Sequence, residues 1–167
     1  MKIFLKTIYI CLLYFNYDIP LKFMKKFYYL GKKSLFRLNR SITGRGTLRT
    51  LKIIQNEIPN LKIIKIKSGK KVFDWTVPNE WNVSEAFVLD KNKKIIIDFK
   101  KNNLHLLGYS TPVNKYINKR YLLKKLYYQK NLPNAIPYLT SYYKKRWGFC
   151  VSYNDYKKIN KKYNNND

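Results

Sequence analysis

The sequence predicts an α+β fold in which helices near the N-terminus precede a series of short strands with one or two further helices. Helical spacing of apolar residues continues as far as Pro59. Beyond it come short runs rich in β-branched and aromatic residues, each bounded by Pro, Asn or Gly. A chain of 167 residues, 46% of them hydrophobic, can also bury the core of one domain, or of one small domain with an appendage.

Two helices are expected in the N-terminal third. Residues 23–38 alternate apolar positions with lysines, which predicts a weakly amphipathic helix interrupted at Gly31. A clearer helix covers residues 48–58, where apolar side chains recur at helical spacing until Pro59 ends the run. The preceding segment 41–46 is rich in hydroxyl groups and glycine, so we expect its hydroxyls to cap this helix.

Short strands account for most of the remaining chain. Residues 61–67 predict a strand followed by a turn. The spacing of further strands at residues 72–77, 86–89, 94–99 and 104–109 predicts an antiparallel meander, and residues 147–153 predict a last strand. Residues 121–129 carry leucines on one helical face and predict a helix. The Lys- and Asn-rich tail, residues 154–167, is expected to fray.

The first 23 residues form an apolar leader with two open interpretations. Its apolar run at residues 8–15 lacks a small-residue cleavage site and is shorter than the ~20 residues of a membrane span. It is either a buried helix or the product of a misassigned start codon, with Met24 as the true start. Because the run is too short to span a bilayer, we expect no membrane. The two cysteines, Cys11 and Cys150, lie far apart and there is no convincing export signal, so we expect no structural disulfide and a cytoplasmic location.

The net charge of +26 raises the question of a nucleic-acid partner. The excess is mainly lysine spread along the whole chain beside abundant Asn, Ile and Tyr, a composition typical of an A/T-rich genome. Arginine, which contacts guanine edges and phosphates bidentately, is scarce. We therefore expect no specific nucleic-acid partner, and only weak, salt-sensitive DNA binding.

The residue inventory argues against catalysis by this chain. A zinc hydrolase needs three or four ligands and a carboxylate base, whereas the chain has one histidine, His105, and nine acidic residues scattered singly. Cys150 with His105 could formally provide a nucleophile and a base, but a buried structural cysteine in an apolar strand is favoured. Residues 44–46 could hold a phosphate at a helix start, although their spacing matches no phosphate-binding fingerprint. We expect no catalytic residue, metal or cofactor.

Two aromatic segments, residues 72–81 and 141–150, remain as candidates for binding. They could form a stacking surface for bases or sugars, or the aromatic core of a small domain with lysines at its rim. The candidate ligand or interdomain contacts in and around these segments are Arg40, Ser41, Thr43, Asp74, Trp75, Trp81, His105, Tyr142, Arg146 and Trp147.

Several motifs resemble one bacterial family. They are Leu38-Asn39-Arg40-Ser41-Ile42-Thr43-Gly44, Phe73-Asp74-Trp75-Thr76-Val77-Pro78, Gly108-Tyr109-Ser110-Thr111-Pro112 and Arg146-Trp147-Gly148-Phe149-Cys150. Their order is similar to that of aminopeptidase-like proteins often labelled polysaccharide-biosynthesis proteins with an aminopeptidase-like domain. The resemblance extends from about residue 35 to residue 154.

The resemblance implies a division of the chain. Residues 24–70 would begin a zinc-exopeptidase α/β domain, residues 71–153 would be an inserted, mainly antiparallel β domain of unknown function, and residues 154–167 would be a tail. The family's zinc ligands lie downstream, so zinc is expected only in a full-length member.

The resemblance also implies a function. The chain would be a truncated or split member, non-catalytic as it stands, with the missing catalytic part of the same gene product as its partner. The alternatives are a stand-alone binding module with an aromatic pocket rim and a weak, non-specific nucleic-acid binder.

Overall fold

The computed structural model describes residues 21–142 and 144–164, so most of the expected leader lies outside the described residues. The chain divides into two compact units, Met1–Leu38 and Asn39–Asp167. Helices and small two-stranded sheets are mixed in it, as expected for the α+β class.

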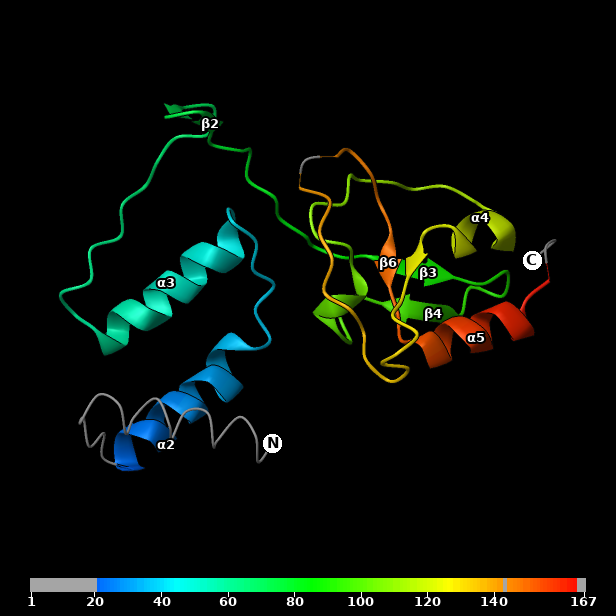
Figure 1. The fold of residues 1–167 in the computed structure, drawn as a ribbon, viewed down its shortest axis with the longest axis horizontal. Coiled ribbons are helices and arrows are strands. Elements are labelled where there is room, and N and C mark those ends of the chain that lie inside the picture. The colour runs from blue at the N-terminus through cyan, green and yellow to red at the C-terminus, as the bar shows by residue number, and fades with distance from the viewer. Residues whose placement is uncertain (1–20, 143, 165–167) are drawn as a thin grey trace. The chain divides into compact units, whose positions relative to one another are not determined.

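The first unit contains a helix that changes its hydrogen-bonding pattern. Helix α2, Leu21–Leu30, continues as a π-helical turn, η1, Gly31–Leu35 (Figure 1). Within this turn the N–H of Phe36 donates to the carbonyl of Gly31 at 2.9 Å. The interruption expected at Gly31 is therefore confirmed, and no residue of α2 or η1 is buried.

The second unit begins with helix α3, Arg45–Glu57, which confirms the clearer of the two helix predictions. The strand expected at residues 61–67 is wrong, because this segment is extended but belongs to no sheet. The single strand expected at residues 72–77 is a hairpin instead. Its strands β1, Lys71–Val72, and β2, Trp75–Thr76, are joined by a tight turn with Phe73 at φ 55°.

The next hairpin matches the sequence prediction. Strands β3, Phe87–Leu89, and β4, Ile95–Asp98, pair antiparallel with an irregular register after Val88. The Asp90 carboxylate organises the turn between them, since it accepts hydrogen bonds from the backbone N–H groups of Asn92 and Lys94 at 3.0 and 2.9 Å.

The elements that follow differ from the expected meander. The strand predicted at residues 104–109 does not form. Its start is a 3₁₀ turn, η2, Asn103–His105, because the Asn102 side chain accepts from the N–H of Leu104 and caps it, and Leu106 and Gly108 form only isolated bridges. The helix predicted at residues 121–129 is the shorter α4, Lys119–Leu123.

One strand pair is parallel, which an antiparallel meander does not contain. Strand β5, Leu126–Tyr127, pairs in parallel with β6, Phe149–Cys150, which is all that forms of the strand expected at residues 147–153. The three sheets described are separate and two-stranded, so the antiparallel meander is wrong.

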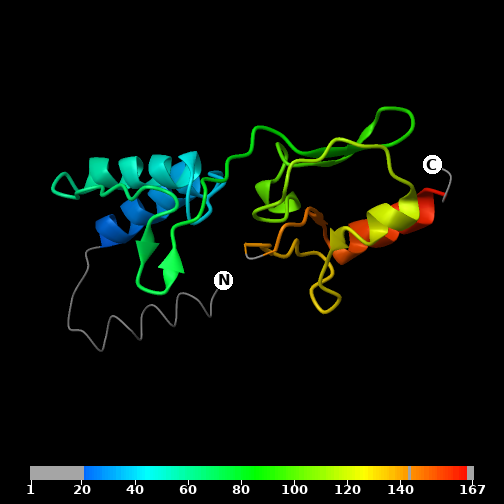
Figure 2. The ribbon, with the colours of Figure 1, turned by 90° about the horizontal axis from the view of Figure 1, so that it is seen from above.

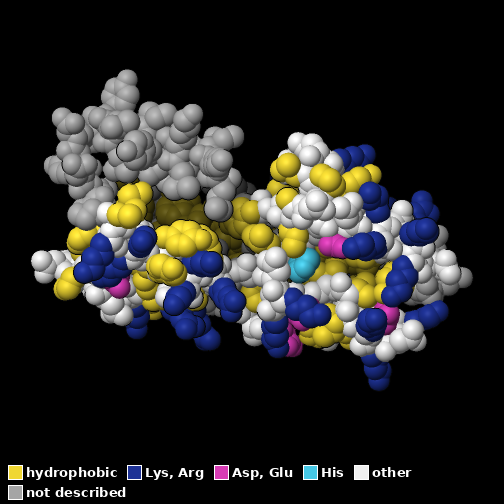
Figure 3. All heavy atoms as spheres, turned by 90° about the horizontal axis from the view of Figure 1, so that it is seen from below, with side chains coloured by type: hydrophobic (Ala, Val, Ile, Leu, Met, Phe, Trp, Pro, Cys, Tyr) yellow, Lys and Arg dark blue, Asp and Glu magenta, His cyan; other side chains and the backbone are white. Residues whose placement is uncertain are grey.

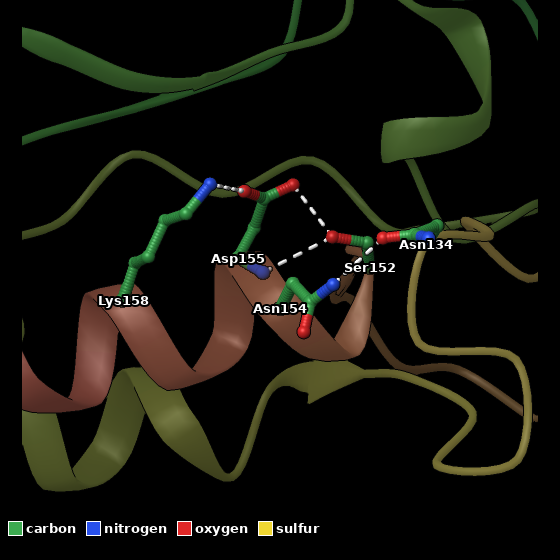
Figure 4. Close-up of polar contacts among 5 residues, drawn as sticks. All are labelled: Asn134, Ser152, Asn154, Asp155 and Lys158. Carbon is green, nitrogen blue, oxygen red and sulfur yellow. Dashed lines mark hydrogen bonds and ion pairs between the residues drawn. The ribbon is translucent and has the colours of Figure 1, made fainter.

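The tail is largely helical, which contradicts the expected fraying. Helix α5, Tyr153–Lys162, begins at a reciprocal cap (Figure 4). The Ser152 hydroxyl accepts from the N–H of Asp155 at 3.0 Å and donates to its carboxylate at 2.7 Å. Ile159 then anchors the helix, since its side chain is buried in the core.

The core of the second unit lies among its C-terminal elements. Helices α4 and α5 lie side by side and are in contact (Figures 1 and 2). Buried apolar side chains from β4, α4, β5, β6 and α5 make up the cluster, with one residue following β6: Ile97, Leu122, Leu126, Phe149, Val151 and Ile159.

Candidate functional site

Three aromatic rings meet where the start of the second unit contacts the rest of it. The rings of Trp81 and Tyr109 stack with centroids 5.5 Å apart, and Tyr142 meets Tyr109 edge-on at 5.0 Å. The indole N–H of Trp81 also donates to the carbonyl of Ser110 at 3.0 Å. We call Trp81, Tyr109 and Tyr142, together with Thr43, the aromatic junction. Ring pairs of this kind contribute about 0.5–1.5 kcal/mol beyond the area they bury.

Thr43 links these rings to the N-terminus of α3. Its hydroxyl donates to the carbonyl of Asn79 at 3.1 Å and shares a hydrogen bond with the Tyr109 hydroxyl at 3.3 Å. Close by, the Asn82 side chain accepts from the backbone N–H of Arg45, the first residue of α3, at 2.7 Å. Segment 41–46 is thus bound to residues 79–82 by side-chain and backbone groups together.

Gly44 permits this close approach, and Gly46 permits a second one, to Asn39. Gly44 has φ 105°, and a Cβ at this position would lie 2.5 Å from the carbonyl oxygen of Trp81. A Cβ on Gly46 would lie 1.8 Å from the carbonyl oxygen of Asn39. These glycines serve backbone packing, and the Arg45 N–H that a phosphate would need is already bonded to Asn82.

The expected capping by Ser41 and Thr43 hydroxyls is wrong. The Ser41 hydroxyl donates to the carbonyl of Thr43, and Thr47 in turn donates to the carbonyl of Ser41. The cap of α3 is Asn82, which is 37 positions away from Arg45 in the sequence. Sequence reasoning missed Tyr109 and Asn82 as members of this site, because no local pattern indicates a partner so far along the chain.

Arg146 and Trp147 make separate contacts. A terminal nitrogen of Arg146 donates to the carbonyl of Thr140 at 3.3 Å, and its buried Nε has no hydrogen-bond acceptor in the described part of the chain. The ring centroids of Trp147 and Tyr121 lie 6.1 Å apart. The ammonium groups of Lys115 and Lys125 both lie over these two rings, 4.8–5.6 Å from the centroids.

The other candidates lie apart from the aromatic junction in their contacts. Asp74 and Trp75 are exposed in the β1–β2 hairpin and take part in none of the hydrogen bonds or ring contacts described for the junction. Arg40 is exposed just before segment 41–46. The structure therefore brings together Ser41, Thr43, Trp81 and Tyr142, whereas the contacts described for Asp74, Trp75, His105, Arg146 and Trp147 lie elsewhere.

His105 and Cys150 are neighbours but do not form a nucleophile and base pair. The Nδ1 atom of His105 is hydrogen-bonded to the backbone carbonyl of Cys150 at 2.8 Å, not to its sulfur. The thiol is fully buried, and this burial raises its pKa to about 11, so it is protonated at neutral pH. The prediction of a buried structural cysteine is confirmed, although His105 lies in η2 and not in a strand.

The donor groups do not fit the zinc that the family resemblance implies for a whole member. Within residues 21–142 and 144–164, no three His, Cys, Asp or Glu residues are grouped so that they could hold a metal ion. Two of the carboxylates serve local structure. Backbone hydrogen bonds in its turn, chiefly from Lys94, lower the pKa of Asp90, and the Ser152 hydroxyl lowers the pKa of Asp155.

The basic side chains do not gather over one site on the face shown in Figure 3, where they alternate with apolar and neutral ones. None of the described helices combines the length and apolar character needed to cross a bilayer.

Comparison with known proteins agrees with this architecture. Residues 80–165 match the model of a family described as a domain of unknown function, DUF2172. A Clostridium acetobutylicum protein, provisionally named a polysaccharide biosynthesis protein with an aminopeptidase-like domain, is 46% identical over 127 residues, which are 76% of this chain and 29% of that protein.

A solved structure is similar to the fold. A crystal structure of a protein from C. acetobutylicum, provisionally described as a peptidase, superposes with a TM-score of 0.76 at 46% identity, over 80% of this chain and 31% of that one. The class defined is an α+β domain found within larger aminopeptidase-like and peptidase-like proteins. This chain belongs to the DUF2172 family, and it spans about a third of the length of the relatives it matches.

Proposed function

We propose that this chain is a non-catalytic part of an aminopeptidase-like protein and that it binds the catalytic part through α3 and the extended segment 61–67. The observation that carries the proposal is the exposure of side chains and backbone groups in these two elements. The apolar side chains of α3 are only half-buried, and those of Ile64 and Ile66 are exposed. Segment 61–67 also presents backbone groups that the described residues leave unpaired.

Helix α3 has an apolar stripe that is only partly covered. Leu48, Leu51 and Ile54 recur at helical spacing, and each is half-buried, with no residue of α3 fully buried. An amphipathic helix is stabilised mainly by packing its apolar face, so α3 is suited to packing against another layer.

The extended segment is suited to strand addition. Ile64 and Ile66 are 83% and 55% exposed. Among the described residues, the backbone of residues 62–66 makes no hydrogen bond to other backbone groups. An unpaired extended segment of this kind is a template for a further strand, and its exposed isoleucines would add side-chain contacts.

The aromatic junction fixes the position of α3 for this binding. Asn82, Thr43 and Gly44 bind the start of α3 to residues 79–82, at the edge of the family domain. In this proposal the junction holds α3 in place and binds no ligand.

The proposal assigns zinc and the catalytic residues to the remaining part of the protein. It also places the protein in the cytoplasm, where the buried Cys150 thiol stays reduced.

The test is reconstitution with the C. acetobutylicum relative. Its remaining segment, without the part that matches this chain, is mixed with this chain, and complex formation is measured by size-exclusion chromatography with light scattering. The relative's own matching segment is the positive control. We expect a 1:1 complex, and aminoacyl-nitroanilide hydrolysis above that of either part alone.

Matched variants locate the interface. Ile64→Ser with Ile66→Ser should weaken the complex at least tenfold, whereas Lys65→Ser with Lys67→Ser, on alternate positions of the same segment, should not. A positive control that assembles while this chain stays monomeric, or a complex equally sensitive to both pairs, would contradict the proposal.

A second candidate function is a binding module for a glycan or protein partner. Two separate observations favour it: the rings of Trp81 and Tyr142 are partly buried, and the buried Nε of Arg146 has no hydrogen-bond acceptor among the described residues. A change in tryptophan fluorescence on titration with monosaccharides would support this module, provided that Trp81→Phe abolishes it. Weak, non-specific nucleic-acid binding is the third alternative, and a steep decline of binding with salt would identify it.

A further inference from the structure

The first unit carries a helix that the proposed function does not use. Helix α2 and the turn η1 lie outside the residues matched by the family domain. Residues 21–38 contain six basic side chains and no acidic one. This charge is denser than the average of the chain, and it coincides with a regular helix.

The helix separates its charges from its apolar side chains. At 100° per residue, Lys22, Lys25 and Lys26 fall within an arc of about 100°. The opposite side carries Leu21, Met24 and two phenylalanines. The exposed fractions are 65% for Leu21, 54% for Phe23 and 55% for Phe27, so the apolar side faces solvent.

The turn that follows extends this pattern. The ammonium groups of Lys32 and Lys33 lie over the rings of Tyr28 and Tyr29, 5.8 and 5.5 Å from the centroids. Both tyrosines are more than half exposed. Tyrosine and lysine side by side at the end of an amphipathic helix suit a boundary between an apolar phase and water.

We propose that α2 and η1 bind the surface of an anionic lipid bilayer, with the helix parallel to the surface. Its phenylalanine side would enter the boundary between headgroups and acyl chains, and its lysines would contact acidic headgroups. The expectation of no membrane rested on the length needed to span a bilayer. Binding to a surface has no such requirement.

The charge and the apolar area of α2 together favour an anionic bilayer over a second copy of the helix and over nucleic acid. A second copy of the helix would bring lysine against lysine, because no acidic side chain stands between residues 21 and 38 to pair with them. Nucleic acid would satisfy the lysines but would leave Phe23 and Phe27 in water, since phosphate contacts use charge and not apolar area.

The experiment is sedimentation of the full chain with large vesicles of phosphatidylcholine alone, or with one third phosphatidylglycerol, at 0.15 M salt. We expect binding only to the anionic vesicles. A variant with Lys22, Lys25 and Lys33 changed to Gln should bind about a hundredfold more weakly, since each lysine near the surface contributes about 1 kcal/mol.

Two further variants separate the helix from the general charge of the protein. The matched control changes Lys62, Lys65 and Lys67 to Gln, and it should bind within about threefold of the parent chain because it alters the same charge outside the helix. Phe23→Ser with Phe27→Ser should weaken binding at least tenfold without changing any charge.

Three results would overturn the proposal. The first is equal weakening by the two lysine triplets, which would show that net charge alone drives binding. The second is full vesicle binding by the phenylalanine variant. The third is a dimer in vesicle-free solution that the phenylalanine variant dissociates, or duplex DNA binding that depends on both phenylalanines, because either would identify a different occupant.

Discussion

The cap of α5 provides the sharpest test of the C-terminal fold, and the perturbation is Ser152→Ala. The Ser152 hydroxyl accepts from the N–H of Asp155 and donates to its carboxylate, and Ser152 is buried (Figure 4). Loss of an N-cap costs about 1 kcal/mol. The hydrogen bond to the carboxylate adds to this, but with a discount, because the Asp155 side chain is 47% exposed. We expect a loss of about 1–2 kcal/mol at pH 7.

The pH dependence of this loss distinguishes the cap from a general packing defect. The hydrogen bond from Ser152 is the main reason that the pKa of Asp155 lies below its ordinary value. A carboxyl group with a depressed folded pKa stabilises the protein above its unfolded pKa, and this contribution is lost as the pH falls through the folded pKa. The difference between Ser152→Ala and the parent should therefore shrink in acid, although the bond to the backbone N–H keeps part of it.

The assay is urea unfolding followed by far-UV circular dichroism at pH 7, 4 and 3. Ser84→Ala is the matched control, since Ser84 is exposed and makes no hydrogen bond within the described residues. A difference below about 0.3 kcal/mol at pH 7, or one that stays constant down to pH 3, would refute the role assigned to the cap.

Three further predictions concern chemistry and the glycine packing. The Cys150 thiol, measured in a Cys11→Ser chain, should react with a disulfide reagent at neutral pH only after unfolding, because burial raises its pKa to about 11; rapid reaction in the folded state would contradict this. Elemental analysis should find less than a tenth of a zinc ion per chain, with no hydrolysis of aminoacyl-nitroanilides, because the described donors do not group; about one bound zinc would overturn this. Gly46→Ala should destabilise the chain by about 1–3 kcal/mol in urea unfolding, because its Cβ would meet the carbonyl of Asn39, whereas Gly31→Ala has room and should not; equal effects would reject the packing argument.

The elements predicted correctly have signals that lie close together in the sequence. Helix α3 follows from apolar spacing ended by Pro59, and β3 and β4 follow from β-rich runs on either side of a turn organised by Asp90. In each case the residues that determine the element lie within or beside it, so periodicity and turn chemistry suffice.

The elements predicted wrongly depend on single side chains or distant partners. Asn102 caps a 3₁₀ turn at the start of the apolar run 104–109, and Ser152 with Asp155 starts a helix inside a segment whose composition is typical of disorder. The parallel pair β5 and β6 is only two residues long, so it shows no periodicity.

Only part of the candidate site could be predicted, because the rest of it depends on residues that are distant in the sequence. Trp81 and Tyr142 stand out as aromatic residues within conspicuous segments. Asn82 is an ordinary polar residue until the fold brings it to Arg45, 37 positions earlier in the chain. Capping of a helix by a side chain so distant leaves no pattern in the sequence around either residue.

Hydrogen exchange along α3 tests whether this distant cap matters. The N-terminus of α3 is held by Asn82 and by the packing of Gly44 and Gly46, whereas no residue along the helix is buried. Protection in the isolated chain should therefore be highest in β4, β5 and β6 and their neighbours, which contribute to the core. Within α3 it should be low, and confined to the first turns that the cap stabilises.

Asn82→Ala should then remove this remaining protection, because the N–H of Arg45 loses its acceptor, while exchange in the core elements stays unchanged. Adding the catalytic part proposed as the partner should slow exchange throughout α3 and in residues 62–66, because binding would cover the apolar stripe and pair the extended backbone. Uniformly slow exchange across α3 in the isolated monomer would show that the helix is already packed. The proposal that α3 awaits a further layer would then fail, even if the cap itself were confirmed.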